Sequence, residues 1–164
     1  MFTPSPYVQG RAALGIALLR VLVGVAFMFH GYPKIVSPTD WMGPDGFLSP
    51  GMQALVAVVE FVGGIMLIAG FFTRIAAFFI ACDMIGALGL VEIPRGSPFV
   101  GMGHTLEPAL LYLFTMVLLL LAGPGTLSVD ASMWAGRRRA RPAPKSAGTV
   151  DTVTETKRPE TPVA

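Results

Sequence analysis

Three charged side chains, Arg20, Glu60 and Asp83, interrupt the long apolar runs of this chain. If those runs lie in lipid, each charge costs at least about 2.5–3.5 kcal/mol on insertion scales, so such residues are usually paired or functional. Arginine and glutamate can form a bidentate, charge-assisted pair, and a carboxyl group can carry a proton. The three residues are therefore the first candidates for chemistry.

The depths of these three charges are similar. On antiparallel helices that rise about 1.5 Å per residue, Arg20 and Asp83 each lie about 13 Å, and Glu60 about 19 Å, from the same membrane border. We predict that they share one layer and that Arg20 pairs with Glu60, with Asp83 as the alternative partner. The pair is either a register pin between helices or the lining of a site for a polar or redox-active ligand. Asp83 equally fits a carboxyl group hydrogen-bonded to a neighbouring helix.

A second group of candidates lies near the opposite border. His30 and Lys34 are four residues apart and share a helical face, and Glu107 begins the last apolar run on the same side. Together they can bind an anion or relay a proton. Glu107 also has a structural explanation, because the helix dipole favours an acid at a helix N-terminus. His30, His104 and Glu107 match no standard metal-binding spacing, so we predict no metal site.

The elements that carry these residues are apolar and long. The chain has 164 residues, of which 53% are hydrophobic and 13% charged, and its mean hydropathy is +0.65. Soluble domains carry about 25% charged residues, so the surface of this chain must face lipid. About 20 apolar residues span a bilayer. Four runs meet this length: residues 12–31, 52–72, 75–93 and 106–122.

The predicted fold is an all-α, integral membrane four-helix bundle with short loops. With four spans, both termini and the turn at Thr73 and Arg74 lie on one side, which collects most of the Arg and Lys residues. The positive-inside rule places that side in the cytoplasm. The predicted organisation is a cytoplasmic segment (1–11), a transmembrane domain (12–130) and a disordered, basic and Pro-rich tail (131–164). Because the basic residues lie at the membrane borders and in this tail, the net charge of +2 does not indicate nucleic-acid binding.

Small residues recur at helical spacing beside two of the buried charges. Such residues let helix backbones approach closely in membranes. We therefore predict that two faces pack inward: Ala13, Ala17, Arg20, Gly24 and Gly31 on the first helix, and Gln53, Ala57, Glu60, Gly63, Gly64 and Leu67 on the second.

An ordered set of motifs extends over most of the chain. It consists of Arg20…Gly24…His30-Gly31-x-x-Lys34, Glu60-x-x-Gly63-Gly64, Gly70-x-x-Thr73-Arg74-x-Ala76-Ala77, Glu107-x-x-Leu110-Leu111-Tyr112 and Gly123-Pro124-Gly125…Asp130. From Leu14 to Asp130, this set resembles the DoxX family of small bacterial membrane proteins. Asp83, Pro108 and the tail after Asp130 do not match the family pattern.

The resemblance implies a four-helix bundle in the bacterial inner membrane. It also implies a link to quinone-dependent oxidation of sulfur compounds, or to membrane complexes that handle thiol and oxidative stress. The leading hypothesis is a membrane subunit of a quinone-linked oxidoreductase system that works with a soluble oxidoreductase partner and binds no cofactor tightly. Quinone would be an exchangeable substrate. The predicted catalytic residues are Glu60 and Arg20, and the predicted substrate- or quinone-binding residues are Arg20, His30, Lys34, Glu60, Asp83 and Glu107.

Two other functions remain open from the sequence. One is a non-catalytic scaffold that anchors soluble enzymes at the membrane. In that case Arg20 and Glu60 would affect only the abundance of the protein. The other is a small carrier or proton pathway, formed by a homo-oligomer because four helices rarely enclose a channel alone.

Overall fold

The computed structural model describes residues 8–139, and every regular element within that range is a helix. The elements are α1 (Gly10–Val36), α2 (Pro50–Ala69), α3 (Thr73–Gly86), the π-helix η1 (Ala87–Glu92), α4 (Leu106–Ala122) and α5 (Val129–Arg139). Three helices, α1, α2 and the continuous α3–η1, are long and apolar enough to cross a membrane. Helix α4 has 17 residues, at the lower end of the length that spans a bilayer. The predicted class, an all-α four-helix membrane bundle, is confirmed.

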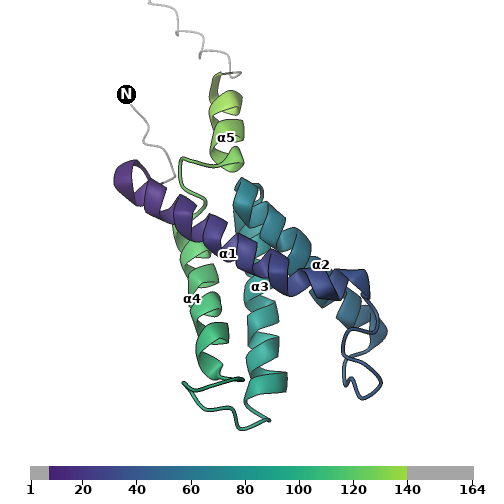
Figure 1. Ribbon diagram of the computed structural model, residues 1–164. Helices are drawn as coiled ribbons and strands as arrows, with labels where there is room; N and C mark the ends of the chain where they lie inside the picture. Colours follow the sequence, from purple (N-terminus) through teal and green to yellow (C-terminus); the bar gives the residue numbers. More distant parts are fainter. Residues whose placement is uncertain (1–7, 140–164) are drawn as a thin grey trace, which may run out of the picture.

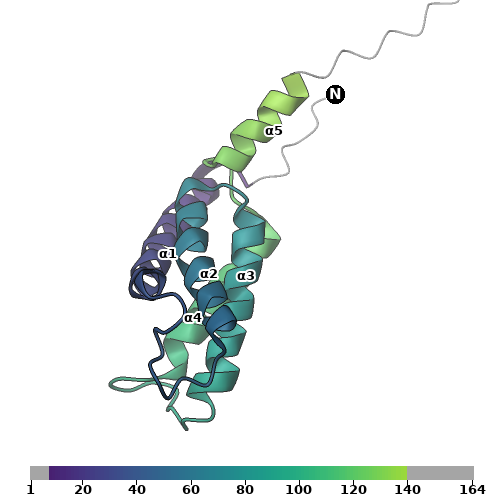
Figure 2. The same ribbon diagram turned by 90° about the vertical axis from the view of Figure 1, so that its right-hand side faces the viewer.

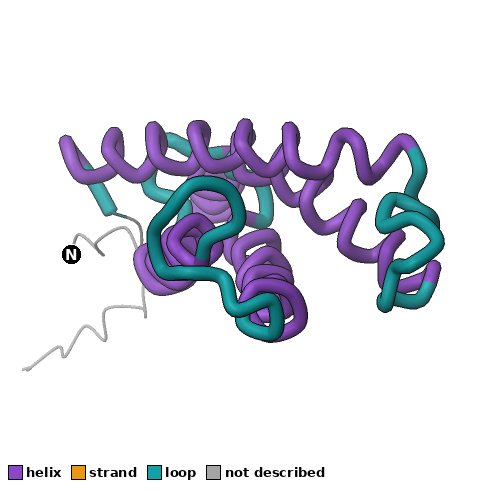
Figure 3. The backbone as a smooth tube through the Cα atoms, turned by 60° about the horizontal axis from the view of Figure 1, so that its bottom comes forward, coloured by secondary structure: helices purple, strands orange, loops and turns teal. Residues whose placement is uncertain are grey.

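Helices α1 to α4 run up and down (Figures 1 and 2). The start of α1, the α2–α3 turn and the end of α4 lie at one end of the bundle, here called the termini end. The connections 37–49 and 93–105 lie at the opposite end, the loop end, where Figure 3 shows them as two separate loops. The predicted arrangement of the connections is therefore present. The assignment of the termini end to the cytoplasm stays a prediction.

Two element boundaries differ from those expected. Helix α1 continues to Val36, past the expected end of the first apolar run at Gly31, and it includes Lys34, in agreement with the helical face predicted for His30 and Lys34. Helix α5 occupies residues 129–139, and the expectation that residues 131–139 are disordered is wrong. The N-terminus of α5 is fixed because the Asp130 backbone N–H donates to Gly70 O at 3.0 Å. The rest of the expected tail, residues 140–164, lies outside the described residues.

Helices α1 and α2 pack with almost no space between their backbones. A Cβ atom built on Gly24 would lie 2.7 Å from Gly64 O, and one built on Gly64 would lie 2.7 Å from Gly24 O. At Gly31, a Cβ atom would lie 2.5 Å from Phe61 N. Only glycine fits at these three positions. The two inward faces predicted from the small residues are confirmed, although Ala17 is only half-buried.

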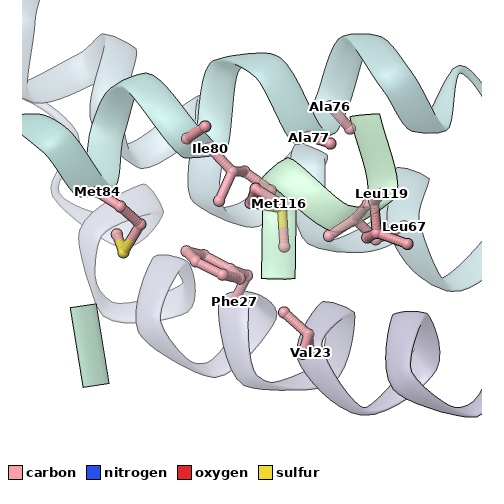
Figure 4. Close-up of a cluster of buried hydrophobic side chains, with 10 residues drawn as sticks. Val23, Phe27, Leu67, Ala76, Ala77, Ile80, Met84, Met116 and Leu119 are labelled. Carbon is pink, nitrogen blue, oxygen red and sulfur yellow. The ribbon is translucent and has the colours of Figure 1, made fainter. Parts of the chain in front are cut away.

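The apolar core lies in the part of the bundle where all four helices meet. Figure 4 shows Phe27 of α1 beside Ile80 and Met84 of α3 and Met116 of α4. The remaining members of the core cluster are Val23, Leu67, Ala76, Ala77, Ala81 and Leu119. Because most apolar side chains outside this cluster are exposed, the bundle turns its other apolar surfaces outward, as expected for a protein in lipid.

Candidate functional site: a polar cavity in the loop half of the bundle

A cavity of about 650 Å³ lies between the α1–α2 pair and the α3–α4 pair. The two pairs diverge toward the loop end, which is visible in Figure 1 as the growing separation of α2 from α3. Phe27 and Met84 belong both to the core cluster and to the cavity wall, so the core forms the floor of the cavity. The volume falls within the range of about 300–1,000 Å³ that is typical of small-molecule sites.

An ion pair stands in the wall formed by α1 and α2. Lys34 Nζ donates a hydrogen bond of 2.7 Å to Glu60 Oε1. Glu60 is only 4% exposed, and its second oxygen, Oε2, is buried without a hydrogen-bond partner. Buried polar atoms are rarely left unpartnered, so this oxygen is an available acceptor beside the cavity.

Trp41, from the loop 37–49, covers the Lys34 ammonium group, with Nζ 4.6 Å from the ring centroid. The indole Nε1 donates to Gln53 O at 3.0 Å. The Gln53 side chain fixes the same loop, because it accepts from Met42 N at 3.2 Å and donates to Leu48 O at 3.0 Å. The buried glutamine therefore holds an aromatic lid over the cation.

Asp83 approaches the ion pair from α3. Its carboxyl group lies close enough to Glu60 and Lys34 for direct electrostatic interaction, and its Oδ2 atom is buried without a partner. The cavity therefore contains two carboxyl groups and one ammonium group at one place. The side chains of Asp83 and Glu60 lie within hydrogen-bonding distance of each other, and both carboxyl groups can take up or release a proton.

The part of the wall formed by α1 and α4 is aromatic. Phe27 of α1 and Tyr112 of α4 pack edge to face with ring centroids 5.0 Å apart, and the His30 ring lies 6.2 Å from Tyr112. All three residues line the cavity. A flat, conjugated ligand could stack in this wall while its polar atoms face the charged group.

At the loop end, Glu92 connects the residues that form the rim of the cavity. Glu92 Oε2 accepts from Ser97 Oγ at 2.6 Å, and Oε1 lies 3.4 Å from His104 Nδ1 and 3.9 Å from Arg95 Nη1. Glu92 and His104 both line the cavity. The loop 93–105 is also tied to the start of α4, because Leu106 N and Glu107 N donate to Pro98 O and Phe99 O.

Four of the six predicted binding residues line the cavity: His30, Lys34, Glu60 and Asp83. Among the described residues, Arg20 and Glu107 do not belong to its wall. Glu107 lies in the first turn of α4, where the helix dipole accounts for an acid. Whether any of these residues acts on a substrate stays a prediction.

The predicted ion pair between Arg20 and Glu60 is wrong, and Asp83 is not the partner of Arg20 either. Arg20 Nη1 donates to Pro124 O at 2.6 Å and Nη2 donates to Leu127 O at 2.7 Å. Its planar fork therefore holds the connection between α4 and α5. The depth argument failed because the Arg20 side chain extends toward the termini end, where it meets Pro124 O and Leu127 O. Lys34, further along α1, reaches Glu60 instead.

Arg20 forms part of a polar cluster that closes the termini end. The Asp130 carboxylate accepts from Phe72 N at 2.8 Å and from Thr73 N at 3.0 Å, which caps the start of α3. Gly70 has a positive φ of 67° and passes so close to Arg20 that a Cβ atom there would lie 2.6 Å from Nη1. The geometry supports the structural interpretation of Arg20.

Most of the cavity lining was absent from the sequence-based site set, including the polar and aromatic side chains of Trp41, Glu92, His104 and Tyr112. Tyr112 lies one helical turn after Pro108 on α4, and it ends the Glu107-x-x-Leu110-Leu111-Tyr112 motif, which could have singled it out. Trp41 and Glu92 belong to the loop end and carry no local signal, because only the folding of two loops brings them to the cavity. His104 was considered from the sequence only as a metal ligand. Within residues 8–139, no group of three or more His, Cys, Asp or Glu side chains is placed to hold a metal ion.

Comparison with known proteins agrees with this architecture. The DoxX family model matches residues 15–93. An uncharacterized membrane protein of Mycobacterium tuberculosis is 34% identical over 129 residues, which cover 70% of this chain and 78% of the relative. A Bacillus subtilis protein named as a putative oxidoreductase, CatD, is 31% identical over 128 residues, which cover 76% of this chain and 91% of the relative. The chain belongs to the DoxX family.

A third relative, an uncharacterized protein of Haemophilus influenzae, is 32% identical over 117 residues and is covered over 87% of its length. The resemblance noted from the ordered motifs is thus confirmed, and so is the membrane setting of a DoxX protein. No solved structure gives a significant match to the chain. The DoxX match includes α1, α2 and α3–η1, which together carry the Lys34, Glu60 and Asp83 group.

Proposed function

We propose that this DoxX protein is a bacterial inner-membrane subunit of an oxidoreductase system and that its cavity binds a quinone. The observation that carries the proposal is the group formed by Lys34, Glu60 and Asp83 in an otherwise apolar cavity. Quinones combine a flat conjugated ring with two carbonyl oxygens at opposite edges. The cavity offers an aromatic wall for the ring and charged groups for a carbonyl oxygen.

Lys34 has the role that the sequence analysis predicted for Arg20. An ammonium group can donate to a quinone carbonyl oxygen, and it stabilises the negative charge that develops there during reduction. Lys34 is already held by Glu60 and covered by Trp41, so its position is fixed before a ligand arrives. His30 and Tyr112 line the same cavity, where their rings can contact the quinone ring.

Reduction of a quinone to the quinol takes up two electrons and two protons. We propose that the electrons come from a soluble oxidoreductase partner or directly from a reduced sulfur donor, in which two thiols become a disulfide and release two electrons and two protons. Glu60 and Asp83 would pass protons to the quinone oxygens, because the two carboxyl groups lie within hydrogen-bonding distance of each other in the cavity wall. The name of the Bacillus subtilis relative supports an oxidoreductase role at the level of the family.

The chain contains two tryptophans, Trp41 in the cavity wall and Trp134 on α5, which makes binding measurable. In a Trp134→Phe protein in lipid nanodiscs, Trp41 is the only indole. Titration with duroquinone, a quinone without a tail, is expected to quench its fluorescence with saturation. Glu60→Gln and Lys34→Met in the same background are expected to weaken binding at least about tenfold, since each removes one charge-assisted contact of about 1.5–3 kcal/mol.

The matched control is Glu107→Gln, which removes an acid near the cavity but not in its wall and should leave the titration unchanged. Linear, unsaturable quenching, or equal saturation in all variants, would contradict the proposal. Quinone-coupled thiol oxidation should also fall in membranes that carry Glu60→Gln in normal amount. Normal turnover there would refute the role given to Glu60 and would favour the scaffold.

A further inference from the structure

The cavity opens to its surroundings on two sides of different chemical character. On the α2–α3 side, its wall includes Leu55, Phe79 and Leu90, which are apolar and roughly half exposed. On the α1–α4 side, the wall includes His30, Tyr112 and, near the rim, His104. A wall residue that is also exposed marks an opening, so the α2–α3 side is an apolar opening and the α1–α4 side a polar one.

The apolar opening lies at the depth of the membrane interior. Cys82 is exposed, lines the cavity and lies nine residues after Thr73, about 13 Å along α3. Since the hydrocarbon core is about 30 Å thick, Cys82 lies near its middle. An opening at this depth meets acyl chains and not water.

The polar group and the apolar opening are connected along one stripe of α3. Phe79, Cys82, Asp83 and Gly86 follow helical spacing of three and four residues, and all of them line the cavity. Asp83 faces Glu60 inside the bundle, whereas Phe79 and Cys82 are exposed. A ligand with its head at Asp83 can therefore extend past Cys82 into lipid without crossing a helix.

Gly86 leaves room in this stripe. A Cβ atom built on Gly86 would meet no atom within 4 Å, so the position is open space in the cavity wall. Gly89 has the same free space, but it does not belong to the wall. The two glycines make a matched pair, because a larger side chain is accommodated at both and narrows the cavity only at Gly86.

We propose that the gap between α2 and α3 is a lateral portal for a lipid-borne ligand with a long hydrocarbon tail. The head group enters from the bilayer and reaches Lys34, Glu60 and Asp83, and the tail remains in the portal along Leu55, Phe79 and Cys82. This inference rests on the proposed quinone function and adds the substrate class, a tail-bearing membrane quinone in place of a water-soluble one.

The portal is tested with decylubiquinone, which has a tail, and duroquinone, which has none. Both rings are fully substituted and do not add to the Cys82 thiol. In the Trp134→Phe protein in nanodiscs, Gly86→Leu is expected to weaken binding of decylubiquinone at least tenfold and that of duroquinone less than twofold. Gly89→Leu is expected to change neither. Equal effects of Gly86→Leu and Gly89→Leu, or equal loss of both quinones, would overturn the portal.

Photocrosslinking supplies an independent readout that needs no variant. A decylubiquinone analogue with a diazirine at the end of its tail should label residues of α2 and α3 around Leu55, Phe79 and Cys82, and excess decylubiquinone should abolish the label. Labelling of α1 and α4 around His30 and Tyr112 would overturn the portal and place the tail on the polar side. If neither quinone quenches Trp41 with saturation, the quinone function itself fails, which is distinct from failure of the portal alone.

Discussion

Lys34 and Glu60 join the loop end of α1 to the middle of α2 through a hydrogen-bonded ion pair of 2.7 Å. The glutamate is almost fully buried, and the side chain of Lys34 is about one-fifth exposed (22%). The pair connects the two helices that Gly24 and Gly64 bring into backbone contact nearer the termini end. It therefore acts both in the packing of the bundle and in the wall of the cavity.

Removing Lys34 alone should destabilise the protein. In Lys34→Met, the Glu60 carboxylate is left buried without its counter-charge, which costs up to about 3–5 kcal/mol for a fully buried pair and less here because Lys34 is partly exposed. We expect a lower Tm of the detergent-solubilised protein. The double variant Lys34→Met with Glu60→Gln should recover most of the loss. A double variant no more stable than Lys34→Met would show that the loss has another source.

Arg20→Lys should destabilise the fold without changing the cavity. Lysine lacks the planar guanidinium group with which arginine donates to Pro124 O and Leu127 O at the same time. At least one charge-assisted hydrogen bond of about 1.5–3 kcal/mol is therefore lost. Thermal unfolding should show the loss, and the folded fraction should bind duroquinone with unchanged affinity. Arg11→Gln, an exposed arginine near the start of α1, is the control and should leave Tm unchanged. Weakened quinone binding by the folded Arg20→Lys protein would show that Arg20 contributes to the binding site after all.

A methyl group at the α1–α2 contact should separate the two helices. The Cβ atom in Gly24→Ala would lie 2.7 Å from Gly64 O, which is backbone and cannot yield easily. Overpacking of this kind costs about 1–3 kcal/mol, which thermal unfolding would reveal. Gly15→Ala on the same helix meets no atom within 4 Å and should be neutral or slightly stabilising. Equal stability of the two variants would argue against the close contact.

Asp130→Asn should weaken the start of α3. The carboxylate accepts from Phe72 N and Thr73 N with separate oxygens, whereas an asparagine side chain has only one acceptor atom. Loss of a helix cap typically costs about 0.5–2 kcal/mol, so Tm should fall, and hydrogen exchange should quicken first in the amides of the initial turn of α3. Asp45→Asn, in the loop 37–49, changes a carboxylate away from this cap and should leave that exchange unaltered.

The hydrophobic pattern was sufficient to predict the helices and their inward faces. Apolar runs of about 20 residues can only be helices in lipid, because every backbone polar group must be satisfied within the segment. The spacing of small residues predicted the inward faces that carry Gly24 and Gly64, since close backbone approach needs small residues at regular positions. Both are local properties, and they can be read from one segment at a time.

The partners of the charged residues depended on tertiary structure. Depths counted along straight, antiparallel helices predicted that Arg20 pairs with Glu60. In the structure, α1 extends to Val36, and Lys34 on this extension pairs with Glu60 instead. Arg20 reaches the carbonyl groups of Pro124 and Leu127, more than 100 residues later in the chain, and carbonyl acceptors have no signature in a sequence.

The sequence by itself therefore determined that this is a DoxX-type membrane bundle and that His30, Lys34, Glu60 and Asp83 are candidates for its site. Only the tertiary structure decided which of them meet, because the divergence of the α1–α2 pair from the α3–α4 pair creates the cavity. It also decided that Trp41, Glu92 and His104 join them from the loop end. The physical reason is that hydrophobic burial is set by local composition, whereas a polar contact is set by the relative placement of whole helices.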